Sequence, residues 1–201
     1  MNLIERVKNI LLKPKQEWLE ISSETATPGQ LATGYVLPLA GLSAAAAFIG
    51  MGLIGTTTFG IKVGGTINHG INQAVMVLVT SLVSFFITTY VVDALAPSFK
   101  SEKDLGKSAQ LVAYASTASY VGGMFSILPA IAILGSLLGL YGLYLLYLGL
   151  PILKKTPDEQ RIPYLVVSIL VLIVVYFALT IVIGLILAPI LGITAAGMLG
   201  K

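Results

Sequence analysis

Long apolar runs separated by short polar segments make up most of the chain, and this pattern predicts membrane-spanning helices. Five runs contain about 20 mostly apolar residues, the length at which an α-helix crosses the hydrocarbon core. The spans are predicted at residues 31–55, 71–95, 108–128, 130–153 and 163–187. The third and fourth come from one continuous apolar run, which Pro129 interrupts near its middle. A single kinked helix is the alternative there, although each half is long enough to cross by itself.

A shorter amphipathic pattern precedes these spans within residues 1–30. Apolar side chains recur at helical spacing on one face, and charged side chains occupy the other. The apolar positions are Leu3, Ile4, Val7, Ile10 and Leu11. Pro14 ends or bends this helix, and Trp18 is expected to turn toward lipid in a second short turn. We expect the segment to lie in the membrane interface near anionic headgroups. The alternative is a cytosolic plug packed under the bundle.

Composition and charge agree with this pattern and give it an orientation. The chain is 56% hydrophobic and only 10% charged, with a mean hydropathy of +0.93, whereas soluble domains are about 25% charged. Lysine and arginine are retained on the cytoplasmic side of a membrane. With the N-terminus inside and the C-terminus outside, only Lys62 and Lys201 of the 12 basic residues fall outside. The predicted fold is an all-α integral membrane protein, with five transmembrane helices in residues 31–201 after the N-terminal amphipathic interfacial helix.

Aromatic residues near the inner ends of the spans support the predicted depth, because amphipathic rings favour the membrane interface. We expect some of these aromatic residues, and the apolar residues of the N-terminal helix, to lie at the membrane interface. The expected interface residues are Ile4, Val7, Leu11, Trp18, Tyr35 and Tyr164.

Asp93 is the acidic residue that falls within a predicted span, close to its inner end. Thr89 lies one turn earlier on the same helix face. On the third span a polar stripe begins at the same depth and consists of Gln110, Tyr114 and Thr117. We expect Asp93 to accept hydrogen bonds from this stripe and so to anchor the second helix to the third. Because ionisable residues inside a membrane often mark ion paths, a transport role is the alternative.

Small residues recur every four positions on the third and fourth spans. They are Ala115, Ser119 and Gly123 on the third, and Gly135 and Gly139 on the fourth. Such faces allow two helix backbones to approach closely in lipid. We expect them to pack within the chain, with the third span at the centre of the bundle. A homodimer face is the alternative.

Motifs for catalysis, metal binding and nucleic-acid binding are missing from the sequence. Cysteine is absent, and the single histidine, His69, is expected in a solvated loop without a carboxylate neighbour. No phosphate-binding loop or hydrolase motif occurs, and the basic residues are interleaved with acidic ones. The sequence therefore predicts a non-enzymatic protein without a cofactor, without a metal and without a nucleic-acid partner.

Three stretches resemble bacterial members of the Yip1 family of polytopic membrane proteins. They are "RVKNILLKPKQEWLEIS", "YVLPLAGL" and the tyrosine–glycine alternation "LYGLYLLYLGL". The resemblance implies a five-span bundle with a cytosolic N-terminal segment in the cell inner (plasma) membrane. It also implies that the cytoplasmic face organises partners, and small GTPases are partners of eukaryotic relatives. We therefore expect a scaffold or adaptor for partners or lipids, and a small transporter or channel working as a homo-oligomer is the alternative.

Overall fold

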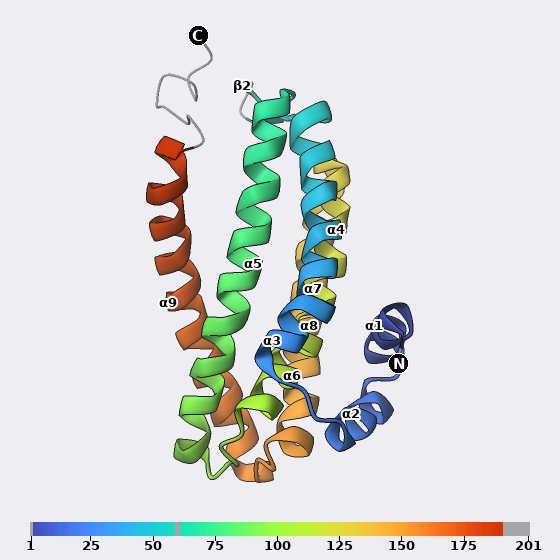
Figure 1. Cartoon of the computed structure of the whole chain (residues 1–201), viewed down its shortest axis with the longest axis vertical. Helices are drawn as coiled ribbons and strands as arrows, with labels where there is room; N and C mark the ends of the chain where they lie inside the picture. The colour runs from blue at the N-terminus through green and yellow to red at the C-terminus, as the bar shows by residue number, and fades with distance from the viewer. Residues whose placement is uncertain (1, 59–60, 191–201) are drawn as a thin grey trace.

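The computed structural model describes residues 2–58 and 61–190 and shows an elongated bundle of helices (Figure 1). The first long helix starts with α3 (Pro28–Leu31), where Thr27 and Gln30 form a capping box. It continues through a π-helical turn (Ala32–Val36) into α4 (Leu37–Phe48) and ends in a second π-helical turn (Ile49–Ile54). A short antiparallel hairpin follows, made of β1 (Thr56–Thr58) and β2 (Ile61–Val63).

The chain then returns along the bundle in α5 (Ile67–Leu95), which a 3₁₀ turn (Ala96–Phe99) extends. His69 is in the first turn of α5 and not in a loop, so the expectation for this residue is wrong. Its Nδ1 lies 2.7 Å from the hydroxyl of Thr66, the residue that caps the helix. This cap starts α5 four residues earlier than the apolar pattern alone predicts, because polar first-turn residues carry no hydropathy signal.

Helices long and apolar enough to cross a membrane number four among the residues that the structure describes. They are Pro28–Ile54, Ile67–Phe99, Pro129–Leu153 and Asp158–Ala178. The last two contain α8 (Ala132–Leu153) and the first part of α9 (Asp158–Ile190). These helices match four of the predicted spans and show a polytopic, all-α membrane bundle. Lys201 lies outside the described residues.

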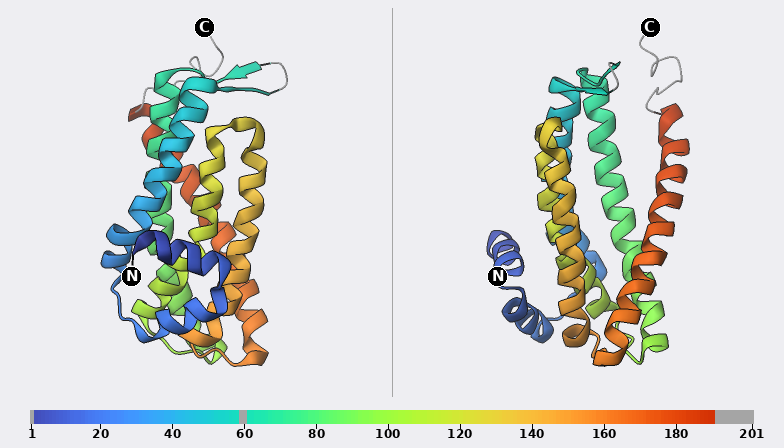
Figure 2. Two further views of the ribbon diagram at one scale, coloured as in Figure 1. Left: turned by 90° about the vertical axis from the view of Figure 1, so that its right-hand side faces the viewer. Right: turned by 180° about the vertical axis from the view of Figure 1, so that it is seen from behind.

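The predicted span 108–128 is interrupted and does not form one long helix. It contains α6 (Leu105–Ala115) and α7 (Thr117–Met124), which meet at Ser116, and a 3₁₀ turn (Phe125–Ile127). A second 3₁₀ turn (Pro129–Ile131) leads into α8, so Pro129 starts the predicted reversal. Figure 2 shows that this α7–α8 connection stops short of the end where α4 and α5 meet. Every residue from 108 to 115 is buried, which places α6 at the centre of the bundle as expected.

Two shorter helices, α1 (Leu3–Leu12) and α2 (Pro14–Ser23), precede the bundle. They form a helical hairpin that lies beside α8, with α1 running crosswise to the bundle helices (Figure 2). The hydroxyl of Tyr141 on α8 donates a 2.8 Å hydrogen bond to the carbonyl of Leu11 at the end of α1. The hairpin is therefore bonded directly to the bundle.

Close helix contact depends on the small residues of α7 and α8. A Cβ atom added to Gly135 would collide with the carbonyl oxygen of Gly122, and the reverse collision also occurs. Ser119 lies opposite Gly139, while a Cβ on Gly142 would come within 3.0 Å of the carbonyl oxygen of Ala115. Gly123 faces α4 instead, where a Cβ would lie 3.0 Å from Ser43. These residues pack within the chain, as expected.

We predict that Gly135→Ala destabilises the protein while Gly139→Ala does not. The first methyl group has to push α7 away, and overpacking of this kind costs about 1–3 kcal/mol. A Cβ on Gly139 meets only the Ser119 hydroxyl, at 3.8 Å, and alanine gains up to about 1 kcal/mol in helix propensity. Unfolding in detergent, followed by circular dichroism, measures both variants. Equal stability of the two variants would contradict the close contact.

Candidate functional site

A buried ion pair joins three elements at the charged end of the bundle. The ammonium of Lys154, at the end of α8, lies 3.1 Å from the Oδ1 atom of Asp93 on α5. The same ammonium donates a 2.6 Å hydrogen bond to the Ser108 hydroxyl on α6, and Ser108 donates to Asp93 at 3.0 Å. Burial lowers the pKa of Lys154, while the hydrogen bond and charge of Asp93 act in the opposite direction. The three side chains therefore form one closed polar cluster.

Asp93 anchors α5 to α6 as the sequence predicts, but through a different partner. Ser108 fills the role that was expected of Gln110, Tyr114 and Thr117. Those three side chains point to other elements, described below. The Thr89 hydroxyl is buried without a hydrogen-bond partner in the described part of the chain. The sequence pattern also did not identify Lys154 as the partner of Asp93.

A second charged cluster fixes the N-terminal hairpin. Arg6 on α1 donates a 2.7 Å hydrogen bond to Glu17 on α2 and a second one to Glu24 after α2. Its guanidinium also lies 5.3 Å from the centre of the Tyr114 ring on α6. Burial opposes the charged form of Arg6, but the hydrogen bond to Glu24 and the nearby carboxylates outweigh it and raise the pKa of the guanidinium. This cluster links α1, α2 and α6.

The face that α1 turns to the bundle differs from the predicted one. Arg6 and Ile10 are buried, Val7 and Leu11 are half-buried against the core, and Ile4 is 75% exposed. The apolar pattern placed Ile4 on the face toward the membrane interface and Arg6 on the opposite, polar face. The exposure of Ile4 agrees with its placement, whereas Arg6 turns to the bundle because two carboxylate partners and an aromatic ring there compensate for its burial.

Donors from α6 hold the end of α2. The ammonium of Lys107 donates 2.7 Å hydrogen bonds to the backbone carbonyls of Ser22 and Glu24. The Gln110 amide donates to the carbonyls of Ile21 and Glu24, at 3.4 and 3.1 Å. These bonds satisfy the carbonyls of Ser22 and Glu24 and add a second donor to that of Ile21, which also accepts from the N–H of Glu24. Two members of the predicted polar stripe, Gln110 and Tyr114, therefore contact the hairpin and not Asp93.

Trp18 is fully buried between α2 and the bundle, so the expectation that its ring faces lipid is wrong. The ring lies edge-on to Tyr114 of α6, and a Cβ on Gly149 of α8 would come within 3.0 Å of it. A glycine on α8 thus provides the space that the indole fills. Hydropathy and interface statistics for tryptophan cannot reveal such a recess, because it depends on a residue far along the chain.

The two expected interface tyrosines are also buried within the protein. The Tyr35 hydroxyl lies 2.6 Å from that of Thr117, which in turn donates to the carbonyl of Tyr114. Tyr164 on α9 is stacked on Phe99 and donates a hydrogen bond to the carbonyl of Val92. Each tyrosine joins two bundle segments, so neither ring lies on the outer surface at this end.

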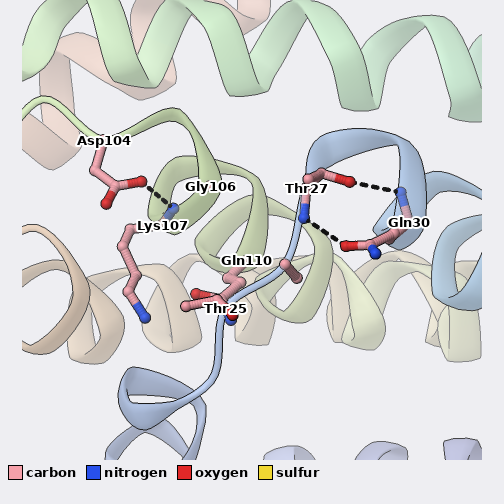
Figure 3. A pocket seen from close by; sticks show the side chains of 8 residues that line it. Thr25, Thr27, Gln30, Asp104, Gly106, Lys107 and Gln110 are labelled. Carbon is pink, nitrogen blue, oxygen red and sulfur yellow. Dashed lines mark hydrogen bonds between the residues drawn. The ribbon is translucent and has the colours of Figure 1, made fainter.

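A pocket of about 470 Å³ lies where the linker after α2 crosses the start of α6. Figure 3 shows the two hydrogen-bonded turns that border it. In one, Asp104 accepts from the backbone N–H of Lys107; in the other, Thr27 and Gln30 bond reciprocally. Gln110 forms part of the lining, and its Oε1 atom has no hydrogen-bond partner in the described structure. Both charged side chains at this pocket, Asp104 and Lys107, already form hydrogen bonds within the protein. The pocket therefore resembles a structural contact between the linker and α6 more than a ligand-binding site.

The outward face of the hairpin is both apolar and basic. Ile4, Lys8 and Leu12 recur at intervals of four on the exposed side of α1. Lys13, Lys15 and Leu19 continue this exposed surface onto α2. We call these six residues the hairpin face. None of its three lysines forms an ion pair within the described residues, so their charges are available to a partner.

The clusters carry no recognisable catalytic arrangement. Within residues 2–58 and 61–190, no group of three histidine, cysteine, aspartate or glutamate side chains could hold a metal ion. Comparison with known families matches residues 8–180 to the Yip1 domain. The chain belongs to the Yip1 family. No curated protein and no solved structure matches it.

The Yip1 match includes most of the hairpin, the Lys154 cluster and the partners of Arg6, while Arg6 itself precedes it. It begins at Lys8, within α1, and ends within α9. The α1–α2 hairpin is therefore largely part of the family domain and not an appendage to it. Together with the long apolar helices, membership in the Yip1 family identifies a multi-pass membrane protein.

Proposed function

We propose that this Yip1 protein is a non-enzymatic scaffold or adaptor that organises partners or lipids at the cytoplasmic face of the cell inner membrane. The observation that carries the proposal is the hairpin face. Buried contacts of Arg6, Trp18 and Lys107 fix the hairpin to the bundle and leave its basic, apolar side outward. A rigid, presented surface of this kind suits recognition more than catalysis.

The proposed topology has five crossings, with α6 and α7 together forming the third. Although α6 and α7 meet at a break, they run from the charged end toward the α7–α8 connection, and α7 lies between α4 and α8 (Figure 2). Burial of α6 inside the bundle supports this, because an interrupted helix in a membrane needs protein around it. An odd number of crossings places the two termini on opposite sides of the membrane, and the positive-inside rule then assigns the N-terminus to the inside and the C-terminus to the outside.

The hairpin face is proposed to rest in the inner membrane interface. Its crosswise direction in Figure 2 is that of a helix lying in the membrane plane. Leu12 and Leu19 would then enter the headgroup region, while the lysines bind anionic headgroups or an acidic protein surface.

A charge reversal at Lys8, Lys13 and Lys15 tests the adaptor proposal. We expect the triple glutamate variant to lose partners or anionic lipids that co-purify with the wild-type protein in mild detergent, by at least about tenfold. The bundle should remain folded, because the side chains of these lysines form no hydrogen bond or ion pair within the described chain. Quantitative mass spectrometry of the purified protein and its bound lipids measures the loss.

The matched control reverses Lys100 and Lys103, which are exposed in the loop between α5 and α6. It changes the net charge at the same end of the bundle without touching the hairpin face. We expect it to retain the wild-type partners and lipids. Identical recovery from all three proteins, or equal loss from both variants, would overturn the proposal.

A further inference from the structure

A groove on the side of the bundle is lined by hydroxyl groups around the midpoint of α5. Its main part has a volume of about 310 Å³, and an adjoining part of about 110 Å³ extends it toward α8. The two parts share Thr88 of α5, Val112 of α6, and Ser116 and Ser119 at the α6–α7 break. Tyr176 of α9 borders the main part. The combined size falls within the range of small-molecule sites.

Six serine and threonine hydroxyls of this groove have no hydrogen-bond partner among the described residues. Elsewhere in the helices, Ser43, Thr117, Ser126 and Ser136 each bond to a backbone carbonyl. In the described structure no hydrogen bond is formed by the groove hydroxyls of Thr80, Ser81, Ser84, Thr88, Ser116 and Ser119. Polar groups at membrane depth are costly when unsatisfied, because lipid chains offer neither donors nor acceptors. Six such groups in one groove therefore point to a ligand that bonds to them.

The remaining lining excludes a charged ligand. It is apolar, with Phe85 and Val112 in the main part and Leu143, Leu146 and Leu172 in the adjoining part. Among the described residues, no charged side chain lines either part, so an ionic headgroup would have no counter-charge near the membrane centre. A matching ligand combines uncharged oxygen groups with hydrocarbon chains.

The groove is accessible from the lipid side. Ser119 is exposed, and Thr80, Ser84 and Thr88 are partly exposed. The view from behind in Figure 2 shows that α8 and α9 meet at the charged end of the bundle. Toward the opposite end, α9 leans away from α8. A ligand could thus enter sideways from the bilayer without passing through water.

We infer that this groove binds a neutral lipid whose hydroxyl or ester oxygens bond to the serine and threonine hydroxyls, as those of a diacylglycerol would. Such a lipid can move its uncharged polar group to the depth of the groove, whereas a phospholipid keeps its charged headgroup at the interface. The inference is independent of the adaptor proposal, because the groove and the hairpin face share no residue.

A photoactivatable diacylglycerol with a diazirine in one acyl chain tests the inference on the full-length protein in nanodiscs. We expect labelled peptides from α5 and the α6–α7 region. Replacing Ser84, Ser116 and Ser119 with alanine should reduce this labelling about tenfold, since several hydrogen bonds are lost. Unlabelled diacylglycerol should compete, and phosphatidylglycerol should not.

The control variant is Ser136→Ala, which removes an exposed α8 hydroxyl outside the groove. It should label like the wild-type protein, as should the Lys8, Lys13 and Lys15 variant of the hairpin face. Undiminished labelling of the triple alanine variant would overturn the inference. Equal competition by phosphatidylglycerol, or cross-links between two copies of the chain at the groove, would also overturn it.

Discussion

Replacing Lys154 with methionine will lower the free energy of unfolding by about 3–5 kcal/mol, because it leaves the buried carboxylate of Asp93 without its positive partner. The Lys154 side chain is 0% exposed, so neither water nor salt can compensate for its loss. Ser108 would keep a single hydrogen bond to Asp93. Reversible unfolding in mixed detergent micelles measures the change.

The neighbouring lysine provides the control for this prediction. Lys155 also forms an ion pair, with Glu102, but its side chain is 70% exposed. Lys155→Met should therefore change stability by no more than about 1 kcal/mol. The double variant Lys154→Met with Asp93→Leu should recover much of the lost unfolding free energy, because it leaves no unpaired buried charge. Similar effects of Lys154→Met and Lys155→Met would show that the buried pair does not anchor the bundle.

Much of the fold follows from the sequence because lipid imposes simple rules. Runs of apolar residues gave four long helices close to their predicted limits, and Pro129 marked the reversal before α8. The weakly apolar third span was expected at the centre, and α6 is buried there. Each of these features is determined by residues that are close together in the sequence, so a short stretch of sequence is enough to predict it.

The polar clusters were harder to predict because their partners are far apart in sequence. Asp93 stood out as an acid within a span, but Lys154, its partner, lies 61 residues later, just beyond the end of the predicted span 130–153. Arg6 was assigned to the polar face of α1 because a hydropathy pattern treats every charge as exposed. The pattern cannot register that Glu17, Glu24 and Tyr114 together make its burial favourable.

Arg6→Met will open the hairpin, and amide hydrogens in α1 will exchange about a hundredfold faster than in the wild-type protein. Glu17 would remain buried without a positive partner, a penalty of about 3 kcal/mol or more, and the hairpin can relieve it by detaching. Methionine matches the volume of the arginine stem, so the loss of charge and not a cavity causes the effect. Peptide-resolved hydrogen–deuterium exchange in nanodiscs measures the amide exchange rates of α1, with those of α5 in the same sample as the internal reference.

Lys8→Met is the matched control, since Lys8 lies on the same helix and is exposed without an ion pair. Its exchange rates in α1 should equal those of the wild-type protein. A double variant, Arg6→Met with Glu17→Gln, should recover part of the protection because no buried charge is then left unpaired. If Arg6→Met left exchange in α1 unchanged, the packing of Ile10 and Trp18 and the hydrogen bonds from the bundle would hold the hairpin without Arg6. The charged cluster would then have no part in presenting the hairpin face, and the adaptor proposal would lose the contact that fixes its binding surface.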